Sequence, residues 1–342
     1  MDASPIEMLG QAEQTARAHA ASLPPCLIVI VDTEEEFDWS TPLSRGNVSV
    51  ESVSGQTAAH KVFDRYGLVP TYVVDYPVAC TSSSAGILRD LRESGRCLIG
   101  AHLHPWVNPP HVEAVNPRNS YPGNLPPEIE HEKLARLTET IERNFAVQPF
   151  IYRAGRFGFG PSTGAALERL GYRVDTSIVP ATSFAADGGP DFTPFGFEPF
   201  WFGSRGDLLE LPQSCGFCGF LQGAGPGLYP KLFEDPLAKV RAPGIFARLR
   251  LLERIRLTPE GIDLEAQKRL VRALLKQGCR VFTYTYHSPS LVPGNTPYVR
   301  TKHDLKMFLQ RMDAFFEWFI DECGGKPTTP SEIYDQLSAN RP

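Results

Sequence analysis

The sequence predicts an α/β barrel built as one domain, and three observations support this fold. Short apolar runs rich in β-branched residues alternate along the chain with longer segments whose apolar residues have helical spacing. Several of these runs end in Asp, His or Arg, as strands do where they converge on the functional end of a barrel. From residue 25 to residue 325 no linker, internal repeat or low-complexity tract divides the chain, so one domain is expected.

The strands are predicted first, because each apolar run is short and bounded by Gly, Pro or polar residues. In order, the seven predicted strands lie at 26–32, 69–75, 96–104, 150–153, 172–178, 208–212 and 281–287. Helical spacing predicts helices at 57–66, 85–94, 128–145, 162–170, 263–277 and 304–320. The first, second and fourth of these helices are followed directly by glycine, which suits the left-handed residue that closes a helix. The aromatic stripe of 304–320 is interpreted as core packing.

Domain boundaries follow from where this alternation breaks. Residues 1–24 are expected to form an N-terminal extension, 25–325 the barrel, and 326–342 a C-terminal tail. Within the barrel, the segment 213–259 is rich in Gly, Pro and basic residues, so we interpret it as an insertion over the mouth or rim. It serves either as a substrate lid or as an oligomer contact.

The strongest functional signal follows the first predicted strand. Five acidic residues occupy the seven positions from Asp32 to Asp38, directly after the apolar run 26–31. Acids at the carboxyl end of a barrel strand are candidates for metal ligation or general-base catalysis. The alternative is a solvated acidic loop, which is what most charge runs are. Glu35, Glu36 and Asp38 are assigned to that solvated class.

Three further strand ends carry residues that suit the same chemistry. His102 and His104 stand two apart, and such residues face one side of a strand, so both imidazoles can point at one ion. Arg153 can orient a neighbouring carboxylate through its guanidinium, and Arg156 offers the same group. His287 ends the last run, before a Ser-Pro turn that exposes it. Each of these residues also has a purely structural interpretation. His102 and His104 would then be half-buried histidines, Arg153 part of a structural ion pair, and His287 the cap of a strand end.

In combination these blocks resemble the polysaccharide deacetylase (NodB-homology) family, carbohydrate esterase family 4. The matching order is Val-Asp-x-Glu, Gly-x-His, Arg-Ala-Gly and Tyr-x-Tyr-His-Ser-Pro. The blocks Val-Asp-Thr-Glu-Glu-Glu-Phe-Asp-Trp and His-Leu-His-Pro-Trp are similar to those of its cytoplasmic branch among polysaccharide-biosynthesis proteins. The resemblance spans residues 25–325 and implies a distorted (β/α)7 barrel, a divalent metal ion and hydrolysis of an N-acetyl group from an amino sugar.

The resemblance also implies catalytic roles for individual residues. Asp32 takes the place of the catalytic base, Arg153 that of the arginine orienting it, and His287 that of the general acid. Backbone N–H groups near Arg156 and Phe157 are expected to stabilise the oxyanion. An Asp and Trp pair that orients the acidic histidine in the family has no match in this sequence.

The implied metal ligands depart from the family pattern at two positions. The second acid of the family's first block is a ligand, but here it is replaced by Thr with Glu34 following, so either Glu34 or Asp32 supplies the carboxylate. His102 matches the first His of a His-x-x-x-His block, whereas the position four later is Trp106. Either His104 takes the place of the missing ligand, or the metal site has been lost.

Composition excludes nucleic acid as a partner and favours a reducing compartment. A net charge of −5 on 342 residues lacks the basic footprint of nucleic-acid binding. Seven cysteines, an odd number, include three in apolar strand runs, where a free thiol acts as a small hydrophobe. The pair Cys215 and Cys218 lacks a second pair at zinc-finger spacing and is assigned to a loop. No apolar run reaches membrane-spanning length and residues 1–23 lack an apolar signal core, so a cytoplasmic location is expected.

The function expected from these observations is metal-assisted amide hydrolysis by a carbohydrate N-deacetylase that uses Zn²⁺ or a similar ion. A cytoplasmic enzyme would meet a nucleotide- or lipid-linked acylamino sugar, and Trp39 and Trp106 either stack on its ring or only pack. The insertion offers as phosphate partners Lys231, Lys239, Arg241, Arg248 and Arg250. Two alternatives stay open: a metal-free amidohydrolase acting on a non-sugar amide, and a non-catalytic sugar-binding protein.

Overall fold

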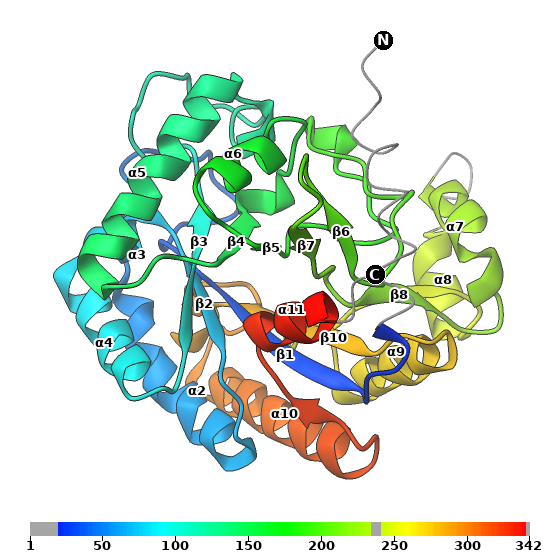
Figure 1. Cartoon of the computed structure of the whole chain (residues 1–342). Coiled ribbons are helices and arrows are strands. Elements are labelled where there is room, and N and C mark those ends of the chain that lie inside the picture. Colours follow the sequence, from blue (N-terminus) through cyan, green and yellow to red (C-terminus); the bar gives the residue numbers. More distant parts are fainter. Residues whose placement is uncertain (1–19, 234–240, 340–342) are drawn as a thin grey trace.

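Parallel strands form the centre of the fold, which we describe from a computed structural model covering residues 20–233 and 241–339. Along the main sheet the strands follow the order β10-β1-β2-β3-β4-β5-β7, each parallel to its neighbour. Their bounds are β1 (Cys26–Thr33), β2 (Thr71–Val74), β3 (Leu98–Leu103), β4 (Ile151–Ala154), β5 (Val174–Asp175), β7 (Leu208–Glu210) and β10 (Val281–His287). These seven strands coincide with the seven predicted runs, and Figure 1 shows the sheet curled inside a ring of helices. The predicted α/β barrel is confirmed.

The barrel is distorted because, within the described residues, the parallel sheet does not close by strand pairing between β7 and β10. Separate hydrogen bonds made by the segments that follow β7 connect them to β10 instead. The backbone N–H of Thr283 donates to Ser214 Oγ at 2.9 Å, and that of Thr285 donates to the carbonyl of Leu257 at 3.2 Å. Leu257 in turn donates to the carbonyl of Ser214 at 2.8 Å. Short strand β6 (Phe200–Phe202) extends the sheet antiparallel to β7.

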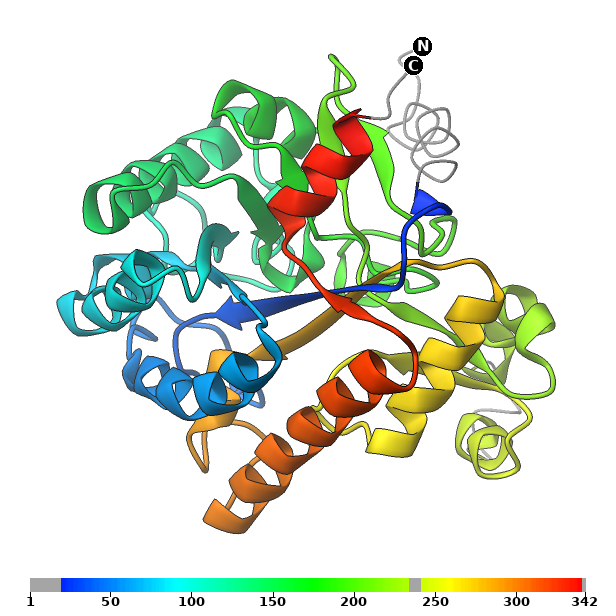
Figure 2. The ribbon, with the colours of Figure 1, turned by 60° about the horizontal axis from the view of Figure 1, so that its bottom comes forward.

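Helices cover the outside of the sheet and bury their apolar faces against it. The predicted helices appear as α2 (Gln56–Phe63), α4 (Ser82–Glu93), α5 (Pro127–Phe145), α6 (Thr163–Arg169), α9 (Leu264–Lys276) and α10 (Lys302–Asp321), with short α3 (Tyr76–Cys80) in addition. The 3₁₀ turn η2 (Asp64–Tyr66) follows the first of them and ends at Gly67, which has a left-handed φ of 63°. Phe315, Phe316 and Phe319 of α10 are fully buried, which confirms the predicted core stripe. Figure 2 shows α9 and α10 side by side.

The insertion folds as a small module with its own core. Strand β8 (Cys215–Cys218) pairs antiparallel with β9 (Glu253–Arg256), and between them lie α7 (Gly225–Leu228), the 3₁₀ turn η7 (Pro230–Phe233) and α8 (Ala242–Arg248). Its core consists of Phe217, Leu232, Ala242 and Leu252. The loop assignment of the cysteine pair was wrong, because both thiols are buried within β8. Lys239 lies outside the described residues.

The C-terminal segment belongs to the fold and is not a tail as expected. Strand β11 (Lys326–Pro327) pairs with β1, and helix α11 (Pro330–Ala339) follows. Ile333 and Leu337 of this helix are fully buried, so burial of apolar surface holds the segment in place. Residues 1–19, most of the expected N-terminal extension, lie outside the described part. Among residues 20–233 and 241–339, every helix is too short or too polar to cross a lipid bilayer.

Candidate metal centre and active site

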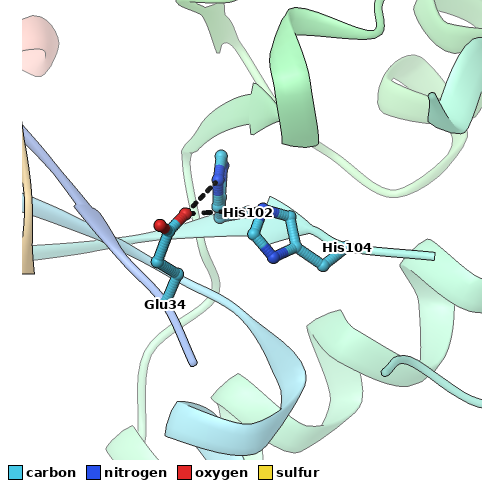
Figure 3. Close-up of side chains that lie close together, drawn as sticks. All are labelled: Glu34, His102 and His104. Carbon is cyan, nitrogen blue, oxygen red and sulfur yellow. Dashed lines mark ion pairs between the residues drawn. The ribbon is translucent and has the colours of Figure 1, made fainter. Parts of the chain in front are cut away.

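Three buried donors converge at the ends of β1 and β3. Glu34 follows β1, His102 lies in β3 and His104 follows it (Figure 3). One carboxylate oxygen, Glu34 Oε2, lies 3.6 Å from His102 Nε2 and 3.5 Å from His104 Nε2. Donors bound about 2.0–2.2 Å from a tetrahedral ion stand about 3.3–3.6 Å apart, so these separations fit a divalent metal.

The unused ring nitrogen of each histidine is held by a partner. His102 Nδ1 lies 3.0 Å from the carbonyl oxygen of Arg153, to which it donates because a carbonyl only accepts. His104 Nδ1 lies 2.7 Å from Glu35 Oε2. Metal-binding histidines use such contacts to fix the tautomer and the ring orientation, leaving Nε2 free to bind. Both imidazoles therefore have the arrangement of metal ligands.

Glu35 is a residue that sequence reasoning assigned wrongly, because it is fully buried rather than solvated. Its Oε1 accepts from Trp106 Nε1 at 2.7 Å, and its backbone N–H donates to Asp75 Oδ2 at 2.7 Å. Burial raises the pKa of Glu35 to about 8 and the pKa of Asp75 well above its usual range. Burial therefore opposes ionisation of both carboxyl groups.

Trp106 packs against the candidate metal centre. Its ring is 1% exposed and stacks on His104 with centroids 4.3 Å apart. The residue that follows β4 is packed just as closely, because a Cβ at Gly155 would lie 2.5 Å from His104 Cδ2. Trp106 and Gly155 therefore both restrict the position of the His104 imidazole.

The candidate base is a buried carboxylate paired with a buried arginine. Asp32 Oδ1 accepts from Arg153 Nη1 at 2.8 Å. Burial raises the pKa of Asp32, but the charges of Arg153, His102 and His287 outweigh it and hold that pKa below its ordinary value. Arg153 Nε and Nη2 have no hydrogen-bond partner among the described residues. Asp32 is thus kept ionised.

The candidate acid faces the base across neighbouring strands. Because β1 and β10 pair Asp32 with His287, His287 Nε2 lies 3.6 Å from Asp32 Oδ2. Its Nδ1 lies 2.7 Å from Glu260 Oε2, and Trp39 contacts the ring edge-on at 5.0 Å. Burial lowers the pKa of His287, but the carboxylates of Glu260, Glu34 and Asp32 overcome this and raise it to about 10. His287 therefore carries a proton at neutral pH.

Glu260 is the functional residue that the sequence did not reveal. It accepts from the backbone N–H of His287 at 3.1 Å and from Ser290 Oγ, in addition to its contact with the imidazole. Glu260 and Trp39 both contact the His287 imidazole. No spacing pattern pointed to Glu260, because it follows directly after the insertion 213–259.

A cavity of about 840 Å³ gathers nine of the ten predicted site residues in its lining. These are Asp32, Glu34, Trp39, His102, His104, Trp106, Arg156, Phe157 and His287. The tenth, Arg153, is fully buried and contacts Asp32. The candidate metal donors, base and acid therefore open onto one cavity.

Backbone strain marks the wall of this cavity after β4. Arg156 and Phe157 have positive φ angles of 53° and 58°, which cost non-glycine residues of order 1–3 kcal/mol each. Surrounding contacts hold them there: the Arg156 guanidinium lies 4.3 Å from the centre of the Tyr121 ring, and the Phe157 ring lies 5.1 Å from the Arg153 guanidinium. Such strain is typical of functional sites.

Comparison with known proteins supports the fold without assigning a family. No protein-family model matches the sequence, and no curated protein matches it. Puue allantoinase superposes with a TM-score of 0.54 at 15% identity, over 100% of this chain and 95% of that one. A probable polysaccharide deacetylase from Pseudomonas aeruginosa PAO1 gives 0.50 at 13% identity, over 96% and 93%. The 4-alpha-glucanotransferase from Thermococcus litoralis gives 0.51 at 11% identity, over 92% of this chain but only 40% of that one. This chain has the curled α/β barrel that these solved enzymes share.

Proposed function

We propose that this protein is a metal-dependent hydrolase that removes an acyl group, in particular N-acetyl, from an amino sugar. The observation that carries the proposal is the position of Glu34 Oε2, which lies 3.5–3.6 Å from the Nε2 atoms of His102 and His104. The Nδ1 atom of each imidazole is in contact with another residue, which fixes the orientation of the ring. A paired carboxylate and a protonated histidine open onto the same cavity. The barrel shared with a solved deacetylase is consistent with this chemistry.

The chemistry of the donors fits a divalent ion, and Zn²⁺ suits two imidazoles and one carboxylate best. Glu34, His102 and His104 would hold it. Such an ion supplies a water of lowered pKa and polarises the acyl carbonyl. Asp32 is less suited to ligation than Glu34, because one of its oxygens is already bound by Arg153. We therefore assign the carboxylate ligand to Glu34.

Side chains and backbone groups of the protein carry out the remaining steps, which are proton removal, oxyanion stabilisation and proton donation. Asp32, held ionised by Arg153, removes a proton from the attacking water. Backbone N–H groups at Arg156 and Phe157 stabilise the oxyanion of the tetrahedral intermediate. His287, kept protonated by Glu260, donates its proton to the leaving nitrogen, which would otherwise depart as an unstable amine anion.

The substrate proposed for this site is an acylamino sugar linked to a nucleotide or a lipid, met in the cytoplasm. Trp39 is half-buried in the cavity wall and offers a face for a sugar ring. Arg156 and Arg256 line the same cavity and offer charge to a diphosphate. Trp106 is fully engaged by His104 and Glu35, so we withdraw the sugar-stacking role for it.

The test is metal content combined with turnover. Purified protein should hold close to one equivalent of a first-row divalent ion, and His102→Ala should lose most of it. His287→Ala should keep the ion but release acetate at least about 100-fold more slowly, because it removes only the acid. His303→Ala, on the exposed start of α10, is the matched control and should change neither quantity. Protein without an ion, or unaltered turnover in His287→Ala, would overturn the proposal.

A second candidate is metal-free hydrolysis of a non-sugar amide, and a solved enzyme named as an allantoinase shares the fold. The two candidates differ in their response to chelation. Under the first, prolonged dialysis against a chelator removes activity, and adding back Zn²⁺ restores it. Activity that survives chelation, measured on simple amides as well as on N-acetyl sugars, would select the second.

A further inference from the structure

Exposed apolar side chains are concentrated on the insertion. Of the nine large hydrophobic residues that are exposed in the described part of the chain, five lie between residues 219 and 252. They are Phe220, Leu221, Phe233, Ile245 and Leu249, and Phe220 is 85% exposed. Clusters of exposed apolar residues on a soluble domain mark an interaction site. We call these five residues, with the basic residues named below, the insertion surface.

Backbone contacts hold the insertion surface together. The N–H of Phe220 donates to the carbonyl of Arg250 at 3.1 Å, and that of Leu221 donates to Leu251 at 2.8 Å. Phe233 stacks edge-on against Tyr229 at 5.2 Å, and η7 contacts α8. The module core beneath is formed by other side chains, so these exposed groups are not needed to fold it. Figure 1 places α7 and α8 on the opposite side of the barrel from α2 and α4.

The same segment is basic in a chain that is acidic as a whole. Residues 219–252 contain five Lys or Arg and two Asp or Glu, a formal charge of +3, whereas the full chain has −5. Four of the basic residues are described, and all four are exposed: Lys231, Arg241, Arg248 and Arg250. In the run Arg248-Leu249-Arg250 the charges directly flank an exposed apolar side chain.

The combination of exposed apolar and basic side chains favours one of three binding partners: a second copy of the chain, a soluble anion or an anionic bilayer. A symmetric contact with a second copy would set four exposed cationic side chains against the same four, which repulsion disfavours. A soluble anion would use the arginines but leave the apolar side chains in water. An anionic bilayer satisfies both, because apolar groups enter the boundary below the headgroups while basic groups meet the phosphates.

We propose that the insertion surface docks this protein on an anionic lipid bilayer. Phe220, Leu221, Ile245 and Leu249 enter the interface, and the four basic residues contact lipid phosphates. Each such Lys or Arg strengthens membrane binding by about fivefold, and the attraction falls as salt rises. None of these surface residues lines the cavity, so the proposal stands independently of the reaction.

The experiment is co-sedimentation of the full chain with vesicles of phosphatidylcholine, alone or mixed with phosphatidylglycerol. Binding is expected only to the mixed vesicles and should weaken as salt increases. Arg248→Gln/Arg250→Gln should bind about 25-fold more weakly, at about fivefold per residue. Phe220→Ser should bind about tenfold more weakly through lost apolar burial.

Matched controls lie on α10, where Lys302→Gln/Lys306→Gln and Met307→Ser change exposed residues of the same kinds and should bind as wild type does. Absence of binding to the mixed vesicles, or equal binding by all variants, would overturn the proposal. A concentration-dependent dimer in sedimentation velocity that Phe220→Ser abolishes would assign the surface to a second copy. Acetate release from a soluble substrate should be unaffected in Phe220→Ser, because Phe220 does not line the cavity, so a failed docking test is distinguishable from a failed hydrolase.

Discussion

Replacing Glu35 by Gln tests the proposed metal centre through a residue outside the proposed ligand set of Glu34, His102 and His104. Glu35 accepts from His104 and from Trp106, each at 2.7 Å, whereas a glutamine side chain has only one acceptor oxygen. If the glutamine oxygen keeps the hydrogen bond from Trp106 Nε1, the glutamine NH₂ group faces His104 Nδ1. Nδ1 must then accept a hydrogen bond, so the proton of the neutral imidazole moves to Nε2. A protonated Nε2 cannot bind a metal ion.

The expected loss of Zn²⁺ affinity can be estimated from the hydrogen bond between Glu35 and His104 that the substitution removes. A hydrogen bond to a charged group contributes about 1.5–3 kcal/mol, which corresponds to roughly 10- to 150-fold in affinity. Removing the outer partner of a metal-binding histidine has a comparable effect, about 10- to 100-fold. We therefore expect Glu35→Gln to weaken Zn²⁺ binding by one to two powers of ten while the protein stays folded.

The measurement is competition for Zn²⁺ with a chromophoric chelator. Glu36→Gln is the matched control, because the neighbouring Glu36 bonds to Ser49 and Ser52 rather than to the ligands. Its affinity should equal that of wild type. If Glu35→Gln binds Zn²⁺ as tightly as the control does, the role of Glu35 in orienting His104 is refuted.

Three further predictions concern pH and coupling. Glu260 opposes the effect of burial on the His287 pKa, so Glu260→Gln should move the alkaline limb of the kcat profile to lower pH; an unmoved limb would contradict this role. Burial raises the pKa of Glu130 from 4.5 to about 7, so its contribution to stability is complete below pH 4.5 and is lost as pH rises to about 7. In urea titrations at about pH 8, Glu130→Gln should therefore raise the free energy of unfolding by up to about 3 kcal/mol, whereas at about pH 4 it should not. Equal effects at the two pH values would contradict a destabilising charge on buried Glu130. Asp32→Asn and Arg153→Ala should each lower kcat at least about 100-fold, and kinetics of the double variant should show little further loss because the two act as one unit.

The parallel strands and the residues at their ends were predictable because two simple rules apply to them. Apolar runs marked the strands, and the alternation of side chains in β3 placed His102 and His104 on one face. Parallel register then set Asp32 beside His287 and His102 beside Arg153. The sequence therefore predicted which side chains meet, although not the distances between them.

Glu35 and Glu260 escaped prediction for different physical reasons. Glu35 stands within a run of acids, and such runs are usually solvated, but burial against Asp75 and Trp106 overrides that expectation. Glu260 is remote in sequence from its partner His287, and only the tertiary fold brings the two together. The C-terminal segment was missed because its strand, Lys326–Pro327, is too short to give a pattern.

The order of the site residues along the chain has a consequence for synthesis of the protein. Glu34, His102 and His104 all precede β4, whereas Glu260 and His287 follow the insertion. A nascent chain emerges from the ribosome N-terminus first. In the proposed mechanism, all three candidate metal ligands are therefore translated before the proton donor, and the site is complete only when β10 has been made and pairs with β1.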